Sequence, residues 1–142
     1  MDEAAWYRLA ADAMLVVHVG IVLYVVLGLV LTLVGGVRGW RWVHHRVFRG
    51  LHLAIIAVIV GQAWAGVICP LTIWENDLRE WGGQTRYDRT FVQHWLSQVL
   101  FFDLPSWVFV VGYSGFGLLV LGALWWVPVR WRGRAAEGRA GD

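Results

Sequence analysis

The chain has few charges, no lysine and a single cysteine. Of its 142 residues, 15% are charged and 58% are hydrophobic, and all twelve basic residues are arginine. With Cys69 alone, the chain has neither an internal disulfide nor a zinc site of the Cys-x-x-Cys type. The sequence also lacks HExxH, GxSxG and glycine-rich phosphate-binding motifs. Nothing in it therefore indicates hydrolytic chemistry, and an enzyme is not the favoured class.

The positive net charge of the chain does not indicate nucleic-acid binding. The formal charge is +2 and the isoelectric point is about 9.1. The arginines, however, are divided among separate segments and form no continuous stripe beside aromatic stacking platforms. Such a stripe is the usual footprint of a nucleic-acid-binding surface, so we expect no nucleic-acid partner.

What the sequence does contain is three long apolar runs, 13–36, 50–71 and 105–127. Each is about as long as the ~20 residues that a helix needs to cross a bilayer. The runs are not interrupted at every third or fourth position, as in a soluble amphipathic helix. The sequence therefore predicts one domain, 1–142, an all-α integral membrane bundle of three transmembrane helices whose first partner is the lipid bilayer.

Tryptophan and arginine mark the ends of these runs. Seven of the eleven tryptophans lie at or just beyond a run's end, where an indole prefers the headgroup region: Trp40, Trp42, Trp74, Trp107, Trp125, Trp126 and Trp131. The linker 37–49 and the tail 128–142 hold four arginines each, whereas the N-terminal segment holds one and the loop 72–104 holds three. Because arginine-rich segments stay in the cytoplasm, we expect a cytoplasmic tail and an outer N-terminus. The first run is too long for a cleaved signal peptide, so we interpret it as a retained span.

The segment 90–102 predicts a fourth, shorter helix. Phe91, Trp95, Leu96 and Val99 fall on one helical face. Its ~12 residues are too few to span a bilayer. We expect an outer amphipathic helix that lies on the membrane or caps the bundle.

Small residues recur every four positions in the second run. Ala57, Gly61 and Ala65 share one helical side, and small residues let a neighbouring backbone approach closely within a membrane. Two interpretations remain open: packing within the three-helix bundle, or a contact face for a partner subunit.

Ionisable groups in or near the spans are the candidate functional residues, because they are costly there. His18 and His52 are separated by roughly 15–20 Å along the membrane normal at ~1.5 Å per residue, which argues against a haem held between them. A better group converges at the outer side: His18, Cys69, Glu75, Arg79, Tyr87 and His94. Histidine pairs ligate haem, and without a CxxCH motif such a haem is non-covalent.

Each member also has a plainer interpretation. His18 fits a histidine that bonds a backbone carbonyl, and Cys69-Pro70 fits a helix end with a small thiol. Glu75 and Arg79, four residues apart, fit a surface ion pair worth a few tenths of a kcal/mol.

The stretch Cys69-Pro-Leu-Thr, followed by Glu75-Asn and Leu78-Arg79, resembles a known family. Together with His18, His52, Gly83, Tyr87 and His94, it is similar to the small bacterial membrane proteins grouped as domain of unknown function 2784. The resemblance covers roughly residues 8 to 104. It implies a multi-span protein of the bacterial inner membrane and supplies no activity. The polar residues selected by their chemistry coincide with its pattern.

Two functional hypotheses follow. The first is a non-catalytic accessory or scaffold subunit that contacts a membrane-protein partner. The second is a small redox-linked protein whose outer-side cluster binds haem b, a quinone or a metal.

Overall fold

The computed structural model describes residues 2–129. In chain order the elements are α1 (Glu3–Arg38), the short 3₁₀ helix η1 (Arg41–His44), α2 (Arg46–Ala65), α3 (Pro70–Trp81), α4 (Phe91–Leu100) and α5 (Ser106–Trp126). The predicted all-α fold class is confirmed, and α1, α2 and α5 are long and apolar enough to cross a membrane. From residue 130 onward the predicted cytoplasmic tail lies outside the described residues.

The first helix is much longer than a bilayer span. Its 36 residues correspond to about 54 Å, against ~30 Å for the hydrocarbon core of a bilayer. It begins where the Asp2 side chain accepts a hydrogen bond from the Ala5 amide, a typical N-cap. It ends at Gly39, whose φ of 70° places it in the left-handed region. The helix therefore continues well beyond the predicted run on its N-terminal side.

The second helix is shorter than the predicted run 50–71. It ends at Ala65, because Gly66 adopts a φ of 66° and the Val67 amide bonds back to the Gln62 carbonyl. Pro70 does not close this helix. It occupies the first turn of α3, where proline is tolerated because no amide hydrogen is needed.

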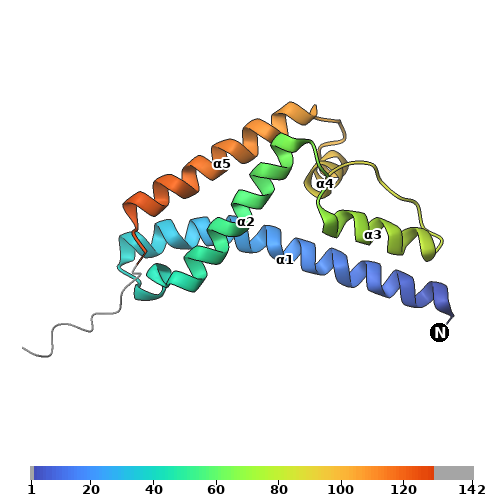
Figure 1. The fold of residues 1–142 in the computed structure, drawn as a ribbon, viewed down its shortest axis with the longest axis horizontal. Coiled ribbons are helices and arrows are strands. Elements are labelled where there is room, and N and C mark those ends of the chain that lie inside the picture. The colour runs from blue at the N-terminus through green and yellow to red at the C-terminus, as the bar shows by residue number, and fades with distance from the viewer. Residues whose placement is uncertain (1, 130–142) are drawn as a thin grey trace, which may run out of the picture.

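Figure 1 shows how the other helices arrange around α1. The spans α2 and α5 pack beside its C-terminal half, and α3 packs beside its N-terminal half. The buried core lies where the three spans meet and consists of Val25, Leu29, Ile56, Val120 and Ala123. Near the far end of α3, Arg8 of α1 donates to the Gly82 carbonyl at 2.6 Å. The molecule thus has a three-span half and a two-helix half that share α1.

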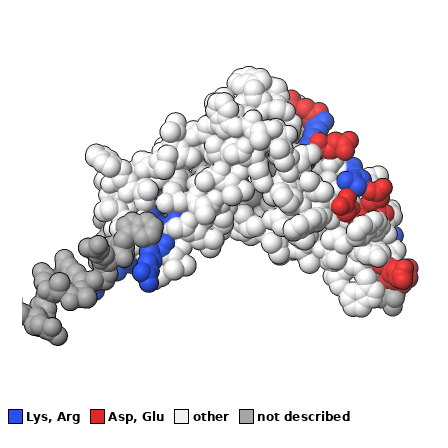
Figure 2. Space-filling view, in the orientation of Figure 1, with Lys and Arg blue, Asp and Glu red and all other residues white. Residues whose placement is uncertain are grey.

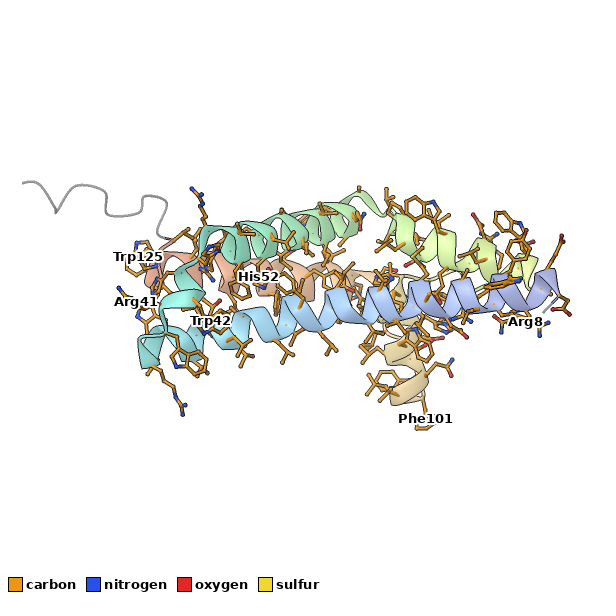
Figure 3. The ribbon with its side chains drawn as sticks, turned by 90° about the horizontal axis from the view of Figure 1, so that it is seen from below. Arg8, Arg41, Trp42, His52, Phe101 and Trp125 are labelled. Atoms are coloured by element: carbon orange, nitrogen blue, oxygen red, sulfur yellow. The ribbon has the colours of Figure 1, made fainter. Side chains whose placement is uncertain are left out.

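The predicted amphipathic segment 90–102 forms α4. Thr90 caps it by accepting from the Gln93 amide, and Phe91 is buried at its start. The helix ends at Phe101, which has a φ of 59° and is 93% exposed. Figure 3 shows Phe101 at the tip of α4, which projects from the side of α1. One end of α4 is therefore anchored in the bundle, and the other is free to meet lipid or a partner.

Most of the span surface is not used for packing within the chain. Only 17–22% of the residues in the most apolar window of each span are buried. Ala57, Gly61 and Ala65 lie on an exposed face of α2, and a Cβ atom added at Gly61 would meet nothing within 4 Å. These three residues therefore do not pack the three spans against one another.

Candidate functional site

A network of polar side chains lies where α1, α3, the 82–90 loop and α4 meet. We call it the glutamate cluster and define it by five residues: His18, Glu75, Arg79, Tyr87 and His94. His18 lies on α1, and Glu75 and Arg79 lie on α3. Tyr87 belongs to the loop, and His94 lies on α4. Five of the six residues selected from the sequence are thus brought into one region, and their functional role stays a prediction.

Glu75 is the centre of this cluster. Its side chain is fully buried, and Arg79 donates from Nε to Oε1 at 2.9 Å. The Tyr87 hydroxyl donates to the other carboxylate oxygen at 3.0 Å. Because Arg79 follows one turn later on α3, its guanidinium reaches Glu75 without leaving the helix surface. Glu75 is therefore a buried carboxylate that accepts hydrogen bonds from both Arg79 and Tyr87. It does not form the surface ion pair of the plainer interpretation.

Asn76 holds the loop in place, although it is not among the six candidate site residues predicted from the sequence. Its side-chain nitrogen donates to the Tyr87 carbonyl at 2.8 Å, and its oxygen accepts from the Tyr87 amide at 3.2 Å. The two bonds fix both sides of the Tyr87 backbone. The available signal was its position beside Glu75, in a polar pair followed by a loop tyrosine.

Each histidine of the cluster stacks on an aromatic ring. His18 lies on Phe91 with ring centroids 4.0 Å apart and an interplanar angle of 17°. His94 lies on Tyr87 at 4.0 Å and 13°. His18 is buried, and its Nδ1 has no hydrogen-bond partner among the described residues. One face of each imidazole is therefore covered, and the buried Nδ1 of His18 is left without a partner among the described residues.

Burial and nearby charges shift the pKa values of Tyr87 and His94, two members of the cluster that lie outside the spans. Burial raises the pKa of Tyr87, and the Glu75 carboxylate raises it further, so the hydroxyl stays a hydrogen-bond donor. Burial lowers the pKa of His94; Glu75 opposes this effect, whereas Arg89 and Arg79 reinforce it. His94 is thus held as a neutral imidazole near pH 7.

Cys69 stands apart from the hydrogen-bonded network. It is the half-buried N-cap residue of α3, and its side chain makes no capping bond. It lies six residues before Glu75, about 9 Å along a helix axis. Within residues 2–129, no group of three His, Cys, Asp or Glu side chains is arranged to hold a metal ion. The cluster therefore offers hydrogen-bond donors and stacking surfaces more readily than metal ligands.

An open pocket borders the cluster at His94. Its volume is about 530 Å³, and its other lining residues include Arg89, Gln98 and Phe102. The size is within the range of small-molecule sites. Its lining combines polar side chains, among them the Arg89–Asp103 ion pair, with the aromatic surface of Phe101 and Phe102.

Comparison with known proteins identifies the family. A family model described as Protein of Unknown function (DUF2784) matches residues 8–129. The chain belongs to this family. The match includes α5, so it extends beyond the residues 8 to 104 that the sequence motifs cover. No curated protein and no solved structure matches the chain significantly.

This DUF2784 family member has a second polar cluster, which was not predicted from the sequence. It lies inside the three-span half and consists of Thr32, Arg49 and His52, all fully buried. Arg49 donates to the Thr32 hydroxyl at 3.0 Å and to the Val127 carbonyl at 3.4 Å. His52 donates from Nε2 to the Val25 carbonyl at 2.7 Å. We call these three residues the arginine–histidine cluster.

A glycine makes room for this second cluster. A Cβ atom at Gly28 would lie 2.8 Å from the His52 ring, so the imidazole fits against α1 only because Gly28 has no side chain. Figure 3 shows His52 between α1 and α2. The signal in the sequence was the spacing of Arg49 and His52, which places both on one face of α2. From the sequence alone, Arg49 is a linker arginine and His52 an isolated histidine of the second run.

Proposed function

We propose that the protein is a non-catalytic accessory or scaffold subunit of a membrane assembly in the bacterial inner membrane. One observation carries the proposal: Ala57, Gly61 and Ala65 form an exposed strip of small residues on α2, on a face that α1 and α5 leave uncovered. Lipid gives no hydrophobic drive for helices to associate, so close contact between small residues supplies van der Waals energy instead. The strip fits a transmembrane helix of another protein.

The test is site-specific crosslinking in the native host. Gly61→Cys is introduced in a Cys69→Ser background, expressed at the native level, labelled with a membrane-permeable maleimide–benzophenone reagent and irradiated, so that the partner needs no cysteine. We expect one dominant adduct with a second membrane protein, identified by mass spectrometry. Only self-adducts, or the adducts of abundant lipid-exposed proteins, overturn the accessory role.

A matched pair of variants distinguishes the strip from general crowding. Gly61→Leu fills the strip, whereas Val58→Leu adds bulk at a 57% exposed position of the same helix. We expect Gly61→Leu to shift the native-gel mobility of the assembly to that of the lone protein, with Val58→Leu unchanged. Equal effects of the two variants contradict the proposal.

The proposed orientation has an outer N-terminus and a cytoplasmic C-terminus. Its support is the distribution of arginine, with eight residues in the linker and tail against four in the N-terminal segment and the long loop. Reporter fusions after residue 84 and after residue 142 test it. The first is expected to be active as alkaline phosphatase and the second as a fluorescent protein; the reverse pattern overturns the orientation.

The second candidate is a redox-linked role for the glutamate cluster. The observation that favours it is the pocket beside His94, which places the His94 imidazole and the Gln98 amide beside the Arg89–Asp103 ion pair. A quinone headgroup, with two carbonyl acceptors and a planar ring, suits these donors. Haem b needs axial ligands, and His18 and His94 stay candidates for that role, because stacking covers the faces of their rings and not the ring nitrogens.

An absorption spectrum of the purified protein, before and after dithionite, tests for haem, and organic extraction with chromatography tests for quinone. This candidate predicts quinone that co-purifies with the wild type and is lost from His94→Ala. A Soret band would instead select haem, with His18 and His94 as the ligands to mutate. Absence of both compounds leaves the accessory role alone.

A further inference from the structure

The end of the bundle formed by η1 and the adjoining ends of α1 and α2 carries three exposed arginines. We call Arg38, Arg41 and Arg46 the arginine collar; all three lie within nine residues and are exposed. The sequence has no Asp or Glu from residue 13 to residue 74. Among residues 2–129, none of the three forms an ion pair. The collar is therefore a concentration of positive charge with no anion supplied by the described chain.

The other exposed end is different in this respect. In the loop region, Arg86 pairs with Asp77 at 2.9 Å and with Glu80 at 2.6 Å, and Arg89 pairs with Asp103. Figure 2 shows the contrast: blue and red surfaces alternate at that end, whereas blue stands without red beside the grey segment. The charge of the collar thus reflects where the acids are placed as well as where the arginines are.

Indole rings place the collar at the depth of lipid headgroups. Trp40 and Trp42 stack with centroids 6.0 Å apart, and the Arg38 guanidinium lies 6.0 Å from the Trp40 ring. Figure 3 shows Arg41 and Trp42 at the same end as Trp125, the penultimate residue of α5. Because exposed indoles at span ends settle in the interfacial region, the guanidinium groups beside them lie at the level of the phosphates.

We propose that the arginine collar binds the phosphate groups of anionic phospholipids. A guanidinium group donates two parallel hydrogen bonds to a phosphate, which a compact ammonium does not. Basic groups beside a transmembrane helix each contribute about fivefold in affinity for an anionic lipid surface. The occupant is a lipid and not a soluble anion, because the collar follows directly from the ends of two spans and lies beside the indoles of Trp40 and Trp42, a residue type that favours the membrane interface.

The test is a lipid titration of the detergent-purified full chain, followed by native mass spectrometry. Phosphatidylglycerol and phosphatidylcholine are added separately, and the ratio of their dissociation constants gives the preference. We expect the wild type to prefer phosphatidylglycerol by at least about fivefold, and the double variant R41Q/R46Q to lose most of this preference. Arg38 is left unchanged, because its guanidinium lies over Trp40 near the end of α1.

Two further variants separate charge, position and folding. R41K/R46K keeps the charge, so its preference should exceed that of R41Q/R46Q while falling below the wild type. R86Q removes an exposed arginine at the opposite end and should leave the preference unchanged. Each variant is compared by elution volume and thermal unfolding, so that only folded protein is titrated.

Three results overturn the proposal. One is a wild type that binds the two lipids equally, and another is an R41Q/R46Q variant that keeps the full preference. The third is displacement of the lipid by millimolar inorganic phosphate, which identifies a soluble-anion site instead.

Discussion

The two ends of the bundle hold their arginines in different ways. At the end built by α3, the 82–90 loop and α4, Arg79, Arg86 and Arg89 each contact a carboxylate of the same chain. At the opposite end, and among residues 2–129, Arg49 is bonded only to a hydroxyl and a carbonyl, and the collar has no acid partner. Within residues 2–129, three arginines are thus paired with carboxylates at one end, whereas the arginines at the other end have no such partner.

This difference separates two uses of arginine in a membrane protein. Where acid and base are close in sequence, as with Glu75 and Arg79, the pair organises a loop that has little apolar surface of its own. Where acids are absent, the exposed arginines are available to the bilayer, and the buried one must be accommodated by neutral oxygen atoms. The following substitutions test whether the two ends differ energetically as well as geometrically.

The largest effect is expected from Glu75→Gln. The substitution leaves the Arg79 guanidinium without its anion in a largely buried position and weakens the bond from Tyr87. Loss of one partner of a buried pair costs about 2–4 kcal/mol when the remaining charge has some access to water. Thermal or denaturant unfolding in detergent measures the change in the free energy of unfolding.

The matched control for this substitution is Glu80→Gln on the same helix. Glu80 is 59% exposed and pairs with Arg86, and exposed pairs contribute at most about 1 kcal/mol. Comparable losses for the two variants would mean that Glu75 does not organise the loop.

Gly28→Ala should have the next largest effect. The new methyl group would lie 2.8 Å from the His52 ring and force the imidazole away from the Val25 carbonyl. Overpacking of this kind costs about 1–3 kcal/mol. Gly20→Ala, at a position with nothing within 4 Å, should cost nothing. If both variants unfold like the wild type, His52 is not fixed against α1.

Arg49→Met tests whether the buried arginine of the three-span half, which has no acid partner among residues 2–129, stabilises the fold. Within residues 2–129, Arg49 has no carboxylate partner, so the substitution strands no buried anion and removes a desolvated charge. We expect a change within about 1 kcal/mol, on the stabilising side. Arg79→Met, which strands Glu75, should cost about 3 kcal/mol. Equal losses in the unfolding measurements would indicate an anionic partner for Arg49.

The spans were predictable because length and composition decide them. A run of apolar residues long enough to cross a bilayer has few alternatives to a helix, and α5 follows its predicted run closely. The end of α2 was not predictable in this way, because both Gly66 and Pro70 are helix-ending signals in the sequence. The structure uses Gly66 as the end of α2 and Pro70 as the start of α3, a choice set by the packing of α3 along α1.

The candidate site was predictable in part. His18, Glu75, Arg79, Tyr87 and His94 are polar residues near one membrane face, and the structure gathers them. The stacking of His18 on Phe91 was not foreseen, because the sequence allowed α4 either to lie on the membrane or to cap the bundle and did not specify which side chains it would contact. The arginine–histidine cluster was missed for a related reason: contacts between α1 and α2 bring its members together, and no local pattern records them.

The smallest effect concerns pH and rests on His94. Burial lowers the pKa of His94 below its usual value of 6.5, so the unfolded chain binds this proton more readily than the folded chain. Stability linked to His94 is therefore complete above pH 6.5 and declines as the pH falls below it. The groups that oppose or reinforce this effect are Glu75 from α3, which favours protonation, and Arg79 and Arg89, which disfavour it. His94→Phe keeps a ring over Tyr87 and removes the titration. The melting temperature of the wild type should therefore fall relative to that of His94→Phe between pH 7 and pH 5. A constant difference across this range would show that His94 has the same pKa in the folded protein as in the unfolded chain.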